Sequence, residues 1–451
     1  MSVEDIAKGF NLPIRKLDLD YKTKREVGHI LTEHEVDYIR NDVEIMARAL
    51  KIMFDENLTK MTIGSDALNN YKQMNKNFKK YFPILPYEID KDIRESYKGG
   101  FTYLNETYKE KEVGEGFVID VNSLYPSVLK YEKLPFGDPI FFVGQYEEDS
   151  LYPLYIQKLT CIFELKDGKI PTIQLKNNLN FLPNEYLKSS NGLPETLTLT
   201  NVDLKLFLDH YDVEIISYDS GWKFKGIKGL FTQYVDYWTK KKIQAKKDEN
   251  KALYTISKLL LNSLYGKMGL SPDVRSKYPY LSDDGIVKYS LYPAEIRDSI
   301  YIPVASFVTS YARYKTITTS QTIKDYSLNK YNEDYYYYSD TDSCHIHKMD
   351  IDELKSIVDI DDYKLGAWKL ESKFVRGKYI RQKCYIELGY DEKMNVTVAG
   401  LPKYLGNLIT FDNFDIGFTT ENIDIEKNKL RYKHVKGGVM LVNSYFTLNR
   451  K

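Results

Sequence analysis

The stretch Tyr335–His347, YYYYSDTDSCHIH, constrains the fold of this chain more than any other. Its tyrosines favour a strand and its Ser339–Asp342 segment favours a turn, so the stretch predicts the tip of a β-hairpin. If the extended conformation continues through the tip, Asp340 and Asp342 project to the same side, because strand side chains repeat every two residues. Two ionised carboxylates ~4 Å apart repel by roughly 4 kcal/mol at an effective dielectric of about 20. Such a pair takes up a proton, binds a cation or lies solvated in a turn.

Composition excludes several classes of protein. The chain has 451 residues and 43% hydrophobic residues, which predicts two to four modules with ample cores. No window is apolar enough for a membrane span, and the start MSVEDIAKGF does not resemble a secretion signal. The three cysteines, Cys161, Cys344 and Cys384, are far apart, which argues against a disulfide framework or a zinc cluster and fits a reducing cytosol.

The net charge gives no overall sign of nucleic-acid binding, because 64 basic residues balance 64 acidic ones. Local imbalance is more informative than the sum. The segments Thr239–Lys247 and Lys369–Lys383 are both strongly basic.

A second candidate carboxylate lies in the apolar run Phe117–Val121, FVIDV, where Asp120 is the one charged residue. The run predicts a buried strand, followed by a turn at Asn122–Tyr125 and a short helix. One interpretation is that Asp120 caps this helix. The other is a metal ligand held at a strand end, beside a turn whose backbone N–H groups can hold phosphate oxygens.

A third pattern lies in TISKLLLNSLYGKMG, which predicts an amphipathic helix. Lys258, Asn262 and Tyr265 follow one another at i, i+4 and i+7 and form a polar stripe. The stripe is either an ordinary solvated face or a nucleotide site, in which a cation meets phosphate and a ring meets sugar and base. The apolar face consists of Ile256, Leu260 and Leu264.

Together the three patterns favour one chemistry. With Asp120 added to Asp340 and Asp342, three aspartates could converge on a pair of divalent cations. Two metals so held clamp the attacking and leaving oxygens of a phosphoryl transfer.

In this order, DVNSLYPS, KLLLNSLYG and YSDTDS resemble motifs A, B and C of family B DNA polymerases. Three further motifs resemble those of the protein-primed subgroup from small tailed bacteriophages, over nearly the whole chain. They are YKGG at Tyr97–Gly100, TSYAR at Thr309–Arg313 and KCY at Lys383–Tyr385.

The resemblance implies a role for each matching residue. Asp120, Asp342 and Asp340 would be catalytic, with two Mg²⁺ ions, replaceable by Mn²⁺, bound by Asp120, Asp342 and the Val121 carbonyl. Tyr125 would be the steric gate against ribose. The nucleotide would also contact Lys242, Lys258, Asn262 and Tyr265. The primed DNA template would contact Tyr97, Gly99, Gly100, Ser123, Pro126, Ser263, Gly266, Arg313, Lys383 and Tyr385.

The resemblance also implies an α+β fold shaped like a right hand, with palm, fingers and thumb. Two insertions would interrupt the polymerase domain, one for the terminal protein that primes synthesis and one for processivity and strand displacement. The expected divisions are 1–61 remnant of an RNase H-like 3′–5′ exonuclease, 62–131 palm, 132–233 first insertion, 234–269 fingers, 270–301 second insertion, 302–398 palm and 399–451 thumb. The expected location is the cytoplasm of an infected bacterium.

The N-terminal region departs from the family pattern. Tyr38 and Asp42 match the third exonuclease motif and Lys16 matches its accessory lysine, but the motif that supplies further carboxylates is not found. We therefore expect a polymerase that lacks most of its exonuclease domain, with a separate exonuclease fragment as a possible partner. The segment His34–Leu58 predicts a helix. One side of it carries Val36, Ile39, Val43, Met46 and Leu50.

Two other functions fit part of the pattern. A metal-dependent glycosyltransferase also uses D-x-D with a nucleotide, but has no need of the Lys-Asn-Tyr helix. A non-catalytic single-strand DNA binder would use tyrosines and lysines, but gains nothing from carboxylates clustered near phosphates. Incorporation of dNTPs into a primed template distinguishes a polymerase from both.

Overall fold

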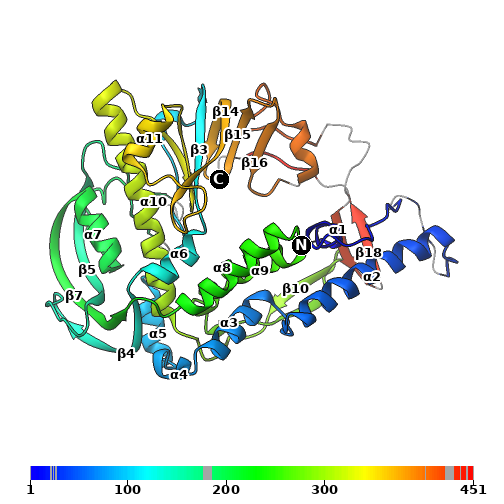
Figure 1. Cartoon of the computed structure of the whole chain (residues 1–451), viewed down its shortest axis with the longest axis horizontal. Coiled ribbons are helices and arrows are strands. Elements are labelled where there is room, and N and C mark those ends of the chain that lie inside the picture. The colour runs from blue at the N-terminus through cyan, green and yellow to red at the C-terminus, as the bar shows by residue number, and fades with distance from the viewer. Residues whose placement is uncertain are drawn as a thin grey trace.

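The structure is a computed structural model that describes residues 2–20, 23, 25, 28–175, 185–401, 403–421, 431–436, 438–442 and 445–449. Its central element is an eight-stranded antiparallel sheet in the order β1-β12-β13-β3-β14-β15-β16, with β2 paired to β14 (Figure 1). The strands are β1 (Thr102–Leu104), β2 (Glu112–Val113), β3 (Gly116–Val121), β12 (Tyr336–Asp340), β13 (Ser343–His347), β14 (Trp368–Arg381), β15 (Cys384–Gly389) and β16 (Met394–Val398).

The predicted strand at Phe117–Val121 is the middle of this sheet. β3 lies between β13 and β14, and all of its residues except Asp120 are buried. An apolar run is therefore stable here, because both of its faces and both of its edges are covered. α6 (Leu124–Tyr131) follows directly, as predicted.

The long helix α10 (Ile302–Tyr331) runs beside the strands in Figure 1, packs against β12 and β13, and is buried around most of its circumference. Some of its buried hydroxyl groups donate within the helix, as those of Thr309 and Ser310 do to backbone carbonyls one turn earlier. Others also bond to neighbouring elements, as the Ser320 hydroxyl does with that of Ser339. Small polar residues let other elements approach closely on several sides. α10 thereby connects the central sheet to the rest of the molecule.

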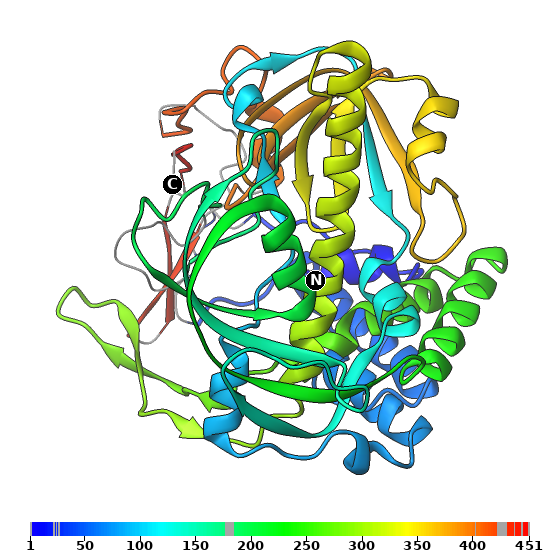
Figure 2. The same ribbon diagram turned by 90° about the vertical axis from the view of Figure 1, so that its left-hand side faces the viewer.

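A second sheet packs against the other side of α10 (Figure 2). Its four antiparallel strands are in the order β4-β7-β5-β6, and α7 (Asn201–His210) lies between this sheet and α10. The strands are β4 (Leu134–Val143), β5 (Leu154–Leu165), β6 (Glu195–Thr200) and β7 (Tyr211–Ile227). Together they occupy the region predicted as the first insertion.

Two antiparallel helices lie below the central sheet in Figure 1, namely α8 (Thr232–Lys247) and α9 (Lys251–Met268). The predicted apolar face of α9 is fully buried, with Ile256, Leu260 and Leu264 each 0% exposed. α3 (Ile63–Met74) covers α9, and two short helices, α4 (Phe78–Tyr81) and α5 (Tyr87–Arg94), lead from it to the central sheet.

Small hairpins complete the described chain. The region predicted as the second insertion pairs β9 (Lys277–Leu281) with β10 (Val287–Leu291) and β8 (Asp273–Val274) with β11 (Glu295–Ile296). A bridge between Ile286 and Val435 connects its tip to the C-terminal hairpin. That hairpin consists of β17 (Arg431–Val435) and β18 (Gly438–Val442). Three short helices lie elsewhere in the described chain, namely α11 (Ile351–Ile357), η1 (Glu106–Tyr108) and η2 (Lys403–Leu408).

The N-terminal helices are α1 (Val3–Gly9) and α2 (Glu33–Asp55). The predicted helix is present, and the side that carries its apolar stripe is not the side that is buried. The buried residues of α2 include Tyr38, Ile45 and Ala49, because α1 and the preceding loop pack against that face. The residues of the apolar stripe are 36–64% exposed, namely Val36, Ile39, Val43, Met46 and Leu50. None of the described helices is long and apolar enough to cross a membrane.

Candidate active site

The hairpin predicted at Tyr335–His347 is present, but its tip is not extended. β12 ends at Asp340, β13 starts at Ser343, and Thr341 between them has a left-handed backbone with φ 63°. Thr341 is fixed from two sides, since its N–H donates to the Phe101 carbonyl at 2.6 Å and its carbonyl accepts from the Thr316 hydroxyl at 2.7 Å. A fixed turn of this kind holds the two neighbouring aspartates in set directions.

Because Thr341 is left-handed, the strand alternation from which we predicted the direction of Asp340 and Asp342 does not continue through the tip, and each carboxylate has its own partners. Asp340 pairs with Lys383 at 2.5 Å and accepts a hydrogen bond from the Thr102 hydroxyl at 3.2 Å. Asp342 instead lies beside β3, where its carbonyl accepts from the Val121 N–H at 2.8 Å. The two carboxylates therefore have different surroundings.

Asp120 and Asp342 form the electrostatically coupled pair of the site. Burial raises the pKa of Asp120 to about 7, and the negative charges of Asp342 and Glu371 add to this effect. Burial also raises the pKa of Asp342, and the negative charges of Asp340 and Glu371 add to this effect. Asp120 does not cap α6, because the N-cap is Ser123 and no side-chain cap bond is present. The capping interpretation of Asp120 is therefore wrong, and the metal ligand stays a prediction.

The donor atoms fit a hard divalent cation. Carboxylate oxygens that are partly buried and repel one another are stabilised by a cation between them, and Mg²⁺ prefers such oxygens. Among the described residues, no three His, Cys, Asp or Glu side chains form a metal site by themselves. A cation at this pair would therefore take further oxygens from the backbone or the substrate, as Mg²⁺ commonly does.

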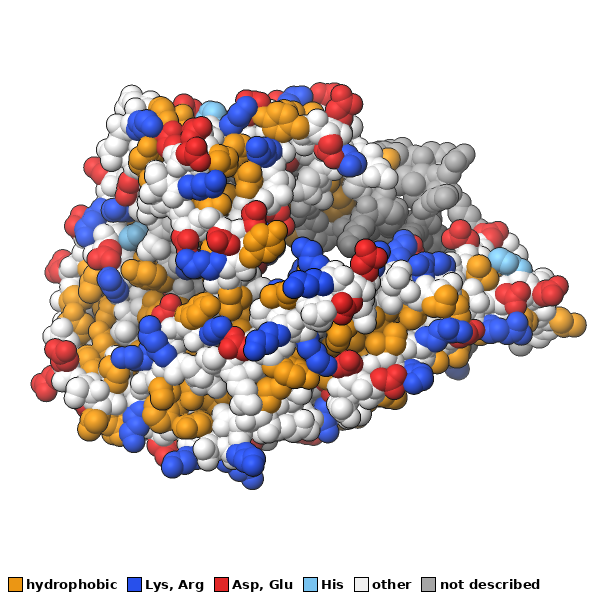
Figure 3. Space-filling model, viewed as in Figure 1, with side chains coloured by type: hydrophobic (Ala, Val, Ile, Leu, Met, Phe, Trp, Pro, Cys, Tyr) orange, Lys and Arg blue, Asp and Glu red, His pale blue; other side chains and the backbone are white. Residues whose placement is uncertain are grey.

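The polar stripe of α9 faces this pair across an opening. Figure 3 shows the molecule hollowed between the central sheet above and the helices α8 and α9 below, with Lys and Arg side chains along the lower side. Lys258 and Asn262 are exposed, whereas Tyr265 is half-buried. The ring of Tyr265 stacks on that of Tyr125 with centroids 4.0 Å apart, so the predicted gate and the predicted pocket residue touch.

Lys242 connects α8 to the turn after β3. Its Nζ donates to the Ser123 hydroxyl at 3.3 Å, and Ser123 has a left-handed backbone with φ 58°. Burial and the neighbouring charges of Lys258, Lys369 and Lys246 lower the pKa of Lys242. Several cations thus converge on one small region, which is an arrangement suited to a polyphosphate.

The residues predicted to contact primer and template are less uniformly placed. Gly100 is required for close approach, because a Cβ there would lie 2.7 Å from Thr341 Cγ2 at the turn between β12 and β13. Tyr97 is half-buried near Gly269 at the end of α9, and Gly99 is exposed. The others lie on the turn before α6 or within α6 (Ser123 and Pro126), on α9 (Ser263 and Gly266), at the β14–β15 turn (Lys383) and on β15 (Tyr385).

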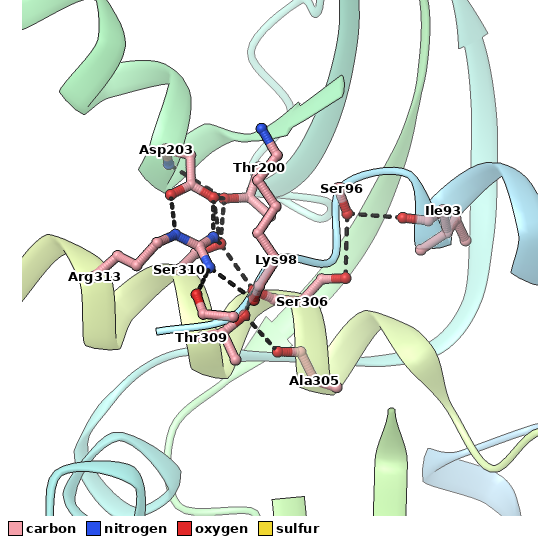
Figure 4. Close-up of polar contacts among 11 residues, drawn as sticks. Ile93, Ser96, Lys98, Thr200, Asp203, Ala305, Ser306, Thr309, Ser310 and Arg313 are labelled. Atoms are coloured by element: carbon pink, nitrogen blue, oxygen red, sulfur yellow. Dashed lines mark hydrogen bonds and ion pairs between the residues drawn. The ribbon is translucent and has the colours of Figure 1, made fainter. Parts of the chain in front are cut away.

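Arg313 is buried within a polar network that joins α10 to α7 and to the YKGG segment (Figure 4). Its guanidinium forms a two-pronged ion pair with Asp203 of α7, at 3.1 and 2.6 Å. It also donates to the carbonyls of Lys98 and Gly99, at 2.8 and 2.7 Å. Arg313 therefore positions the YKGG segment, and a direct contact with DNA stays a prediction.

The sequence interpretation missed three residues of this region: Asp203, Lys369 and Glu371. Lys369 and Glu371 lie in the segment recognised as basic, but their position depends on the register of β14 against β3, which places Lys369 opposite Asp120. The sequence around Asp203 indicated only the start of a helix, where Thr200 caps α7, and gave no sign of its pairing with Arg313.

The predicted exonuclease residues form a cluster of their own, in which Lys16, from the segment before α2, meets Tyr38 and Asp42 of α2. Lys16 Nζ lies 2.7 Å from Asp42 Oδ2 and 2.5 Å from the Tyr38 hydroxyl. The sequence interpretation thus identified three residues that do meet, although Lys16 is 26 positions from Asp42.

Comparison with known proteins agrees with this geometry. Residues 1–358 match the family described as DNA polymerase type B, organellar and viral. The DNA polymerase of Bacillus phage Nf is 46% identical over 99% of this chain and 78% of its own length, and that of Bacillus phage phi29 is 44% identical over 99% of this chain and 77% of its own length.

A solved structure of phi29 DNA polymerase with primer-template DNA and incoming nucleotide superposes with a TM-score of 0.89, at 43% identity, over 100% of this chain and 78% of that one. The predicted polymerase fold is confirmed, and neither alternative function is favoured. The chain therefore belongs to the type B DNA polymerases, organellar and viral, and is a DNA-directed DNA polymerase of the phi29 type.

Proposed function

We propose that Asp120 and Asp342 bind two Mg²⁺ ions, replaceable by Mn²⁺, and that the Val121 carbonyl supplies a further oxygen. The observation that carries this proposal is the partly buried, mutually repelling pair of carboxylates, which has the lysines of α8 and α9 opposite it. The cations would stabilise the charge that develops on the reacting phosphate. Asp340 supports the site by holding Lys383 through their 2.5 Å ion pair.

The incoming nucleotide lies in the opening between the central sheet and α9. Lys242 and Lys258 neutralise its triphosphate, while Asn262 and Tyr265 line the base pair that forms. Tyr125 excludes a ribose 2′-hydroxyl, because its ring is held in place by its stack on Tyr265. A ring that is fixed in this way makes an effective steric gate.

Primer and template follow the surface formed by Tyr97, Gly99, Lys383 and Tyr385. Arg313 holds part of this surface in place through its hydrogen bonds to the carbonyls of Lys98 and Gly99. The phi29 enzyme is solved with primer-template DNA and nucleotide, which supports the same partners here. Gly100 keeps this surface close to the catalytic turn. The remaining contacts come from Ser123, Pro126, Ser263 and Gly266.

The relatives from Bacillus phages support replication of a viral genome in an infected bacterial cell. We infer protein-primed initiation, in which the four-stranded sheet of residues 132–233 receives the terminal protein. The hairpins of residues 270–301 give processivity, and their contact with the C-terminal hairpin at Val435 is consistent with a ring around DNA. Residues 62–131 and 302–398 are then palm, 234–269 fingers and 399–451 thumb, although parts of the thumb and of the first insertion lie outside the described residues.

Residues 1–61 belong to an exonuclease-type domain, and Lys16, Tyr38 and Asp42 are its motif residues. Among the described residues this cluster contributes one carboxylate, whereas two-metal hydrolysis needs several. We therefore expect no 3′–5′ hydrolysis from this chain alone. A separate exonuclease fragment is the partner that would supply the others.

The site is tested by primer extension together with primer-template binding. Wild-type protein and the variants Asp120→Ala and Asp342→Ala are compared on a 5′-labelled primer-template with Mg²⁺. We expect both variants to lose nucleotide incorporation and to bind primer-template as the wild type does. Normal extension by either variant would refute the metal assignment.

A further inference from the structure

Lys369 occupies a position next to the proposed metal ligands that the proposed function does not use. It lies on β14, directly opposite Asp120 of β3. Its Nζ is 3.4 Å from Asp120 Oδ1 and 4.0 Å from Glu371 Oε1. The Lys369 side chain is 33% exposed and that of Asp120 20%, so the contact is only partly screened by solvent.

The charge of Lys369 acts on both sides of the active-site opening. It opposes the rise in the pKa values of Asp120 and of Asp342, and it lowers the pKa of Lys242 on α8. Its ammonium is therefore close to the carboxylates and also to the cations expected to receive the triphosphate.

A divalent cation and this ammonium cannot both lie against Asp120 without strong repulsion, because like charges a few ångströms apart repel even where solvent reaches them. A lysine side chain has four flexible methylene carbons and moves readily. When metal enters, the ammonium must move away, and the triphosphate of a bound nucleotide offers it a new negative partner.

We propose that Lys369 is a tethered counter-ion that competes with the divalent cation for Asp120 until the nucleotide arrives. This inference rests on the proposed function, since it takes Asp120 to be a metal ligand. The ion pair weakens metal binding to the nucleotide-free enzyme, and nucleotide relieves the competition. Metal and nucleotide binding are thereby coupled, and the coupling is reciprocal.

A purely structural role for Lys369 predicts something different. If the ion pair only held β14 against β3, its loss would lower the free energy of unfolding. The variant would then bind metal no more tightly than the wild type. A competitor is distinguished by a gain: its removal tightens metal binding.

The experiment measures Mn²⁺ binding to the full chain by the electron paramagnetic resonance signal of free Mn²⁺, without nucleotide. We expect Lys369→Met to bind Mn²⁺ at least ~5-fold more tightly than the wild type, and Lys369→Arg to bind like the wild type because it keeps the charge. The matched control is Lys373→Met on the same strand, whose ammonium lies over the Phe117 ring and away from Asp120. It should leave the affinity unchanged.

A second titration adds primer-template with a 3′-terminal dideoxynucleotide and the next correct dNTP. The gap between wild type and Lys369→Met should then shrink to less than ~2-fold, because nucleotide removes the competition. Equal or weaker Mn²⁺ binding by Lys369→Met without nucleotide would overturn the inference, and so would a gap that nucleotide does not reduce.

Asp120→Ala separates failure of this inference from failure of the proposed function. If Asp120→Ala binds Mn²⁺ as the wild type does, the metal assignment itself is wrong and the inference falls with it. If Asp120→Ala loses binding while Lys369→Met equals the wild type, the metal site stands and only the role of Lys369 is refuted. Far-ultraviolet circular dichroism of each variant checks that it is folded.

Discussion

The buried ion pair between Arg313 and Asp203 links α10 to α7, and its removal should be among the more costly changes in this polymerase. The Arg313 side chain is 5% exposed and that of Asp203 12%, and the closest N–O distance is 2.6 Å. At an effective dielectric of about 20, charges ~2.6 Å apart attract by about 6 kcal/mol, and desolvation offsets part of this. Removing one partner strands the other charge, which typically costs ~3–5 kcal/mol.

We therefore expect Arg313→Met and Asp203→Asn each to lower the free energy of unfolding by about 3 kcal/mol or more. The double variant should lose at least ~2 kcal/mol less than the sum of the two, because the second change removes the charge that the first left unpaired. Urea denaturation followed by circular dichroism measures these values. The control is Arg48→Met, which breaks an exposed pair with Glu44 and should cost less than ~1 kcal/mol.

Two further measurements test whether this ion pair holds the YKGG segment in place, which a surface ion pair would not do. Hydrogen exchange of residues 97–101 should accelerate in both single variants, because Arg313 donates to the carbonyls of Lys98 and Gly99. Primer extension should fall in Asp203→Asn as well as in Arg313→Met. Strictly additive losses below ~1 kcal/mol each, with unchanged exchange, would refute this reasoning.

The pair also predicts a dependence on acid. Burial by itself would raise the pKa of Asp203, but the charge of Arg313 and its hydrogen bonds hold that pKa below the ordinary value. Between the unfolded and folded pKa values the unfolded chain binds more protons, so stability rises with pH there. The contribution is present above about pH 4 and is lost as pH falls through the lower folded value. Arg313→Met should abolish this part of the acid dependence.

Other expectations follow from the same contacts. Asp120→Ala and Asp342→Ala should each reduce the rate of incorporation at least ~100-fold while primer-template binding in a gel-shift assay is retained, because the aspartates hold cations rather than DNA. Tyr125→Val should raise rNTP incorporation relative to dNTP in a single-nucleotide assay, and an unchanged ratio would speak against Tyr125 as the gate. The 451-residue chain should extend primers without degrading a 3′-mismatched single strand in Mg²⁺; degradation that is lost in Asp42→Ala would show a complete exonuclease site.

The amino-acid sequence by itself determined the local elements and most of the candidate site. The apolar run around Asp120 indicated a covered strand, and the spacing of Lys258, Asn262 and Tyr265 indicated a polar stripe on an amphipathic helix. The order of these motifs was enough to indicate the polymerase family. Such features depend on neighbours within a few positions, and periodicity records them directly.

Contacts between distant segments were decided only by the tertiary structure. Asp340 turns to Lys383, 43 positions away, and Arg313 finds Asp203 at a distance of 110 positions. The placement of Lys369 opposite Asp120 depends on strand register, which no local pattern specifies. For α2, periodicity identified an apolar stripe including Val43, but the helix is oriented by what packs against its other face. Packing decides which charged side chains form ion pairs, because the two partners come from elements that only the complete fold brings together.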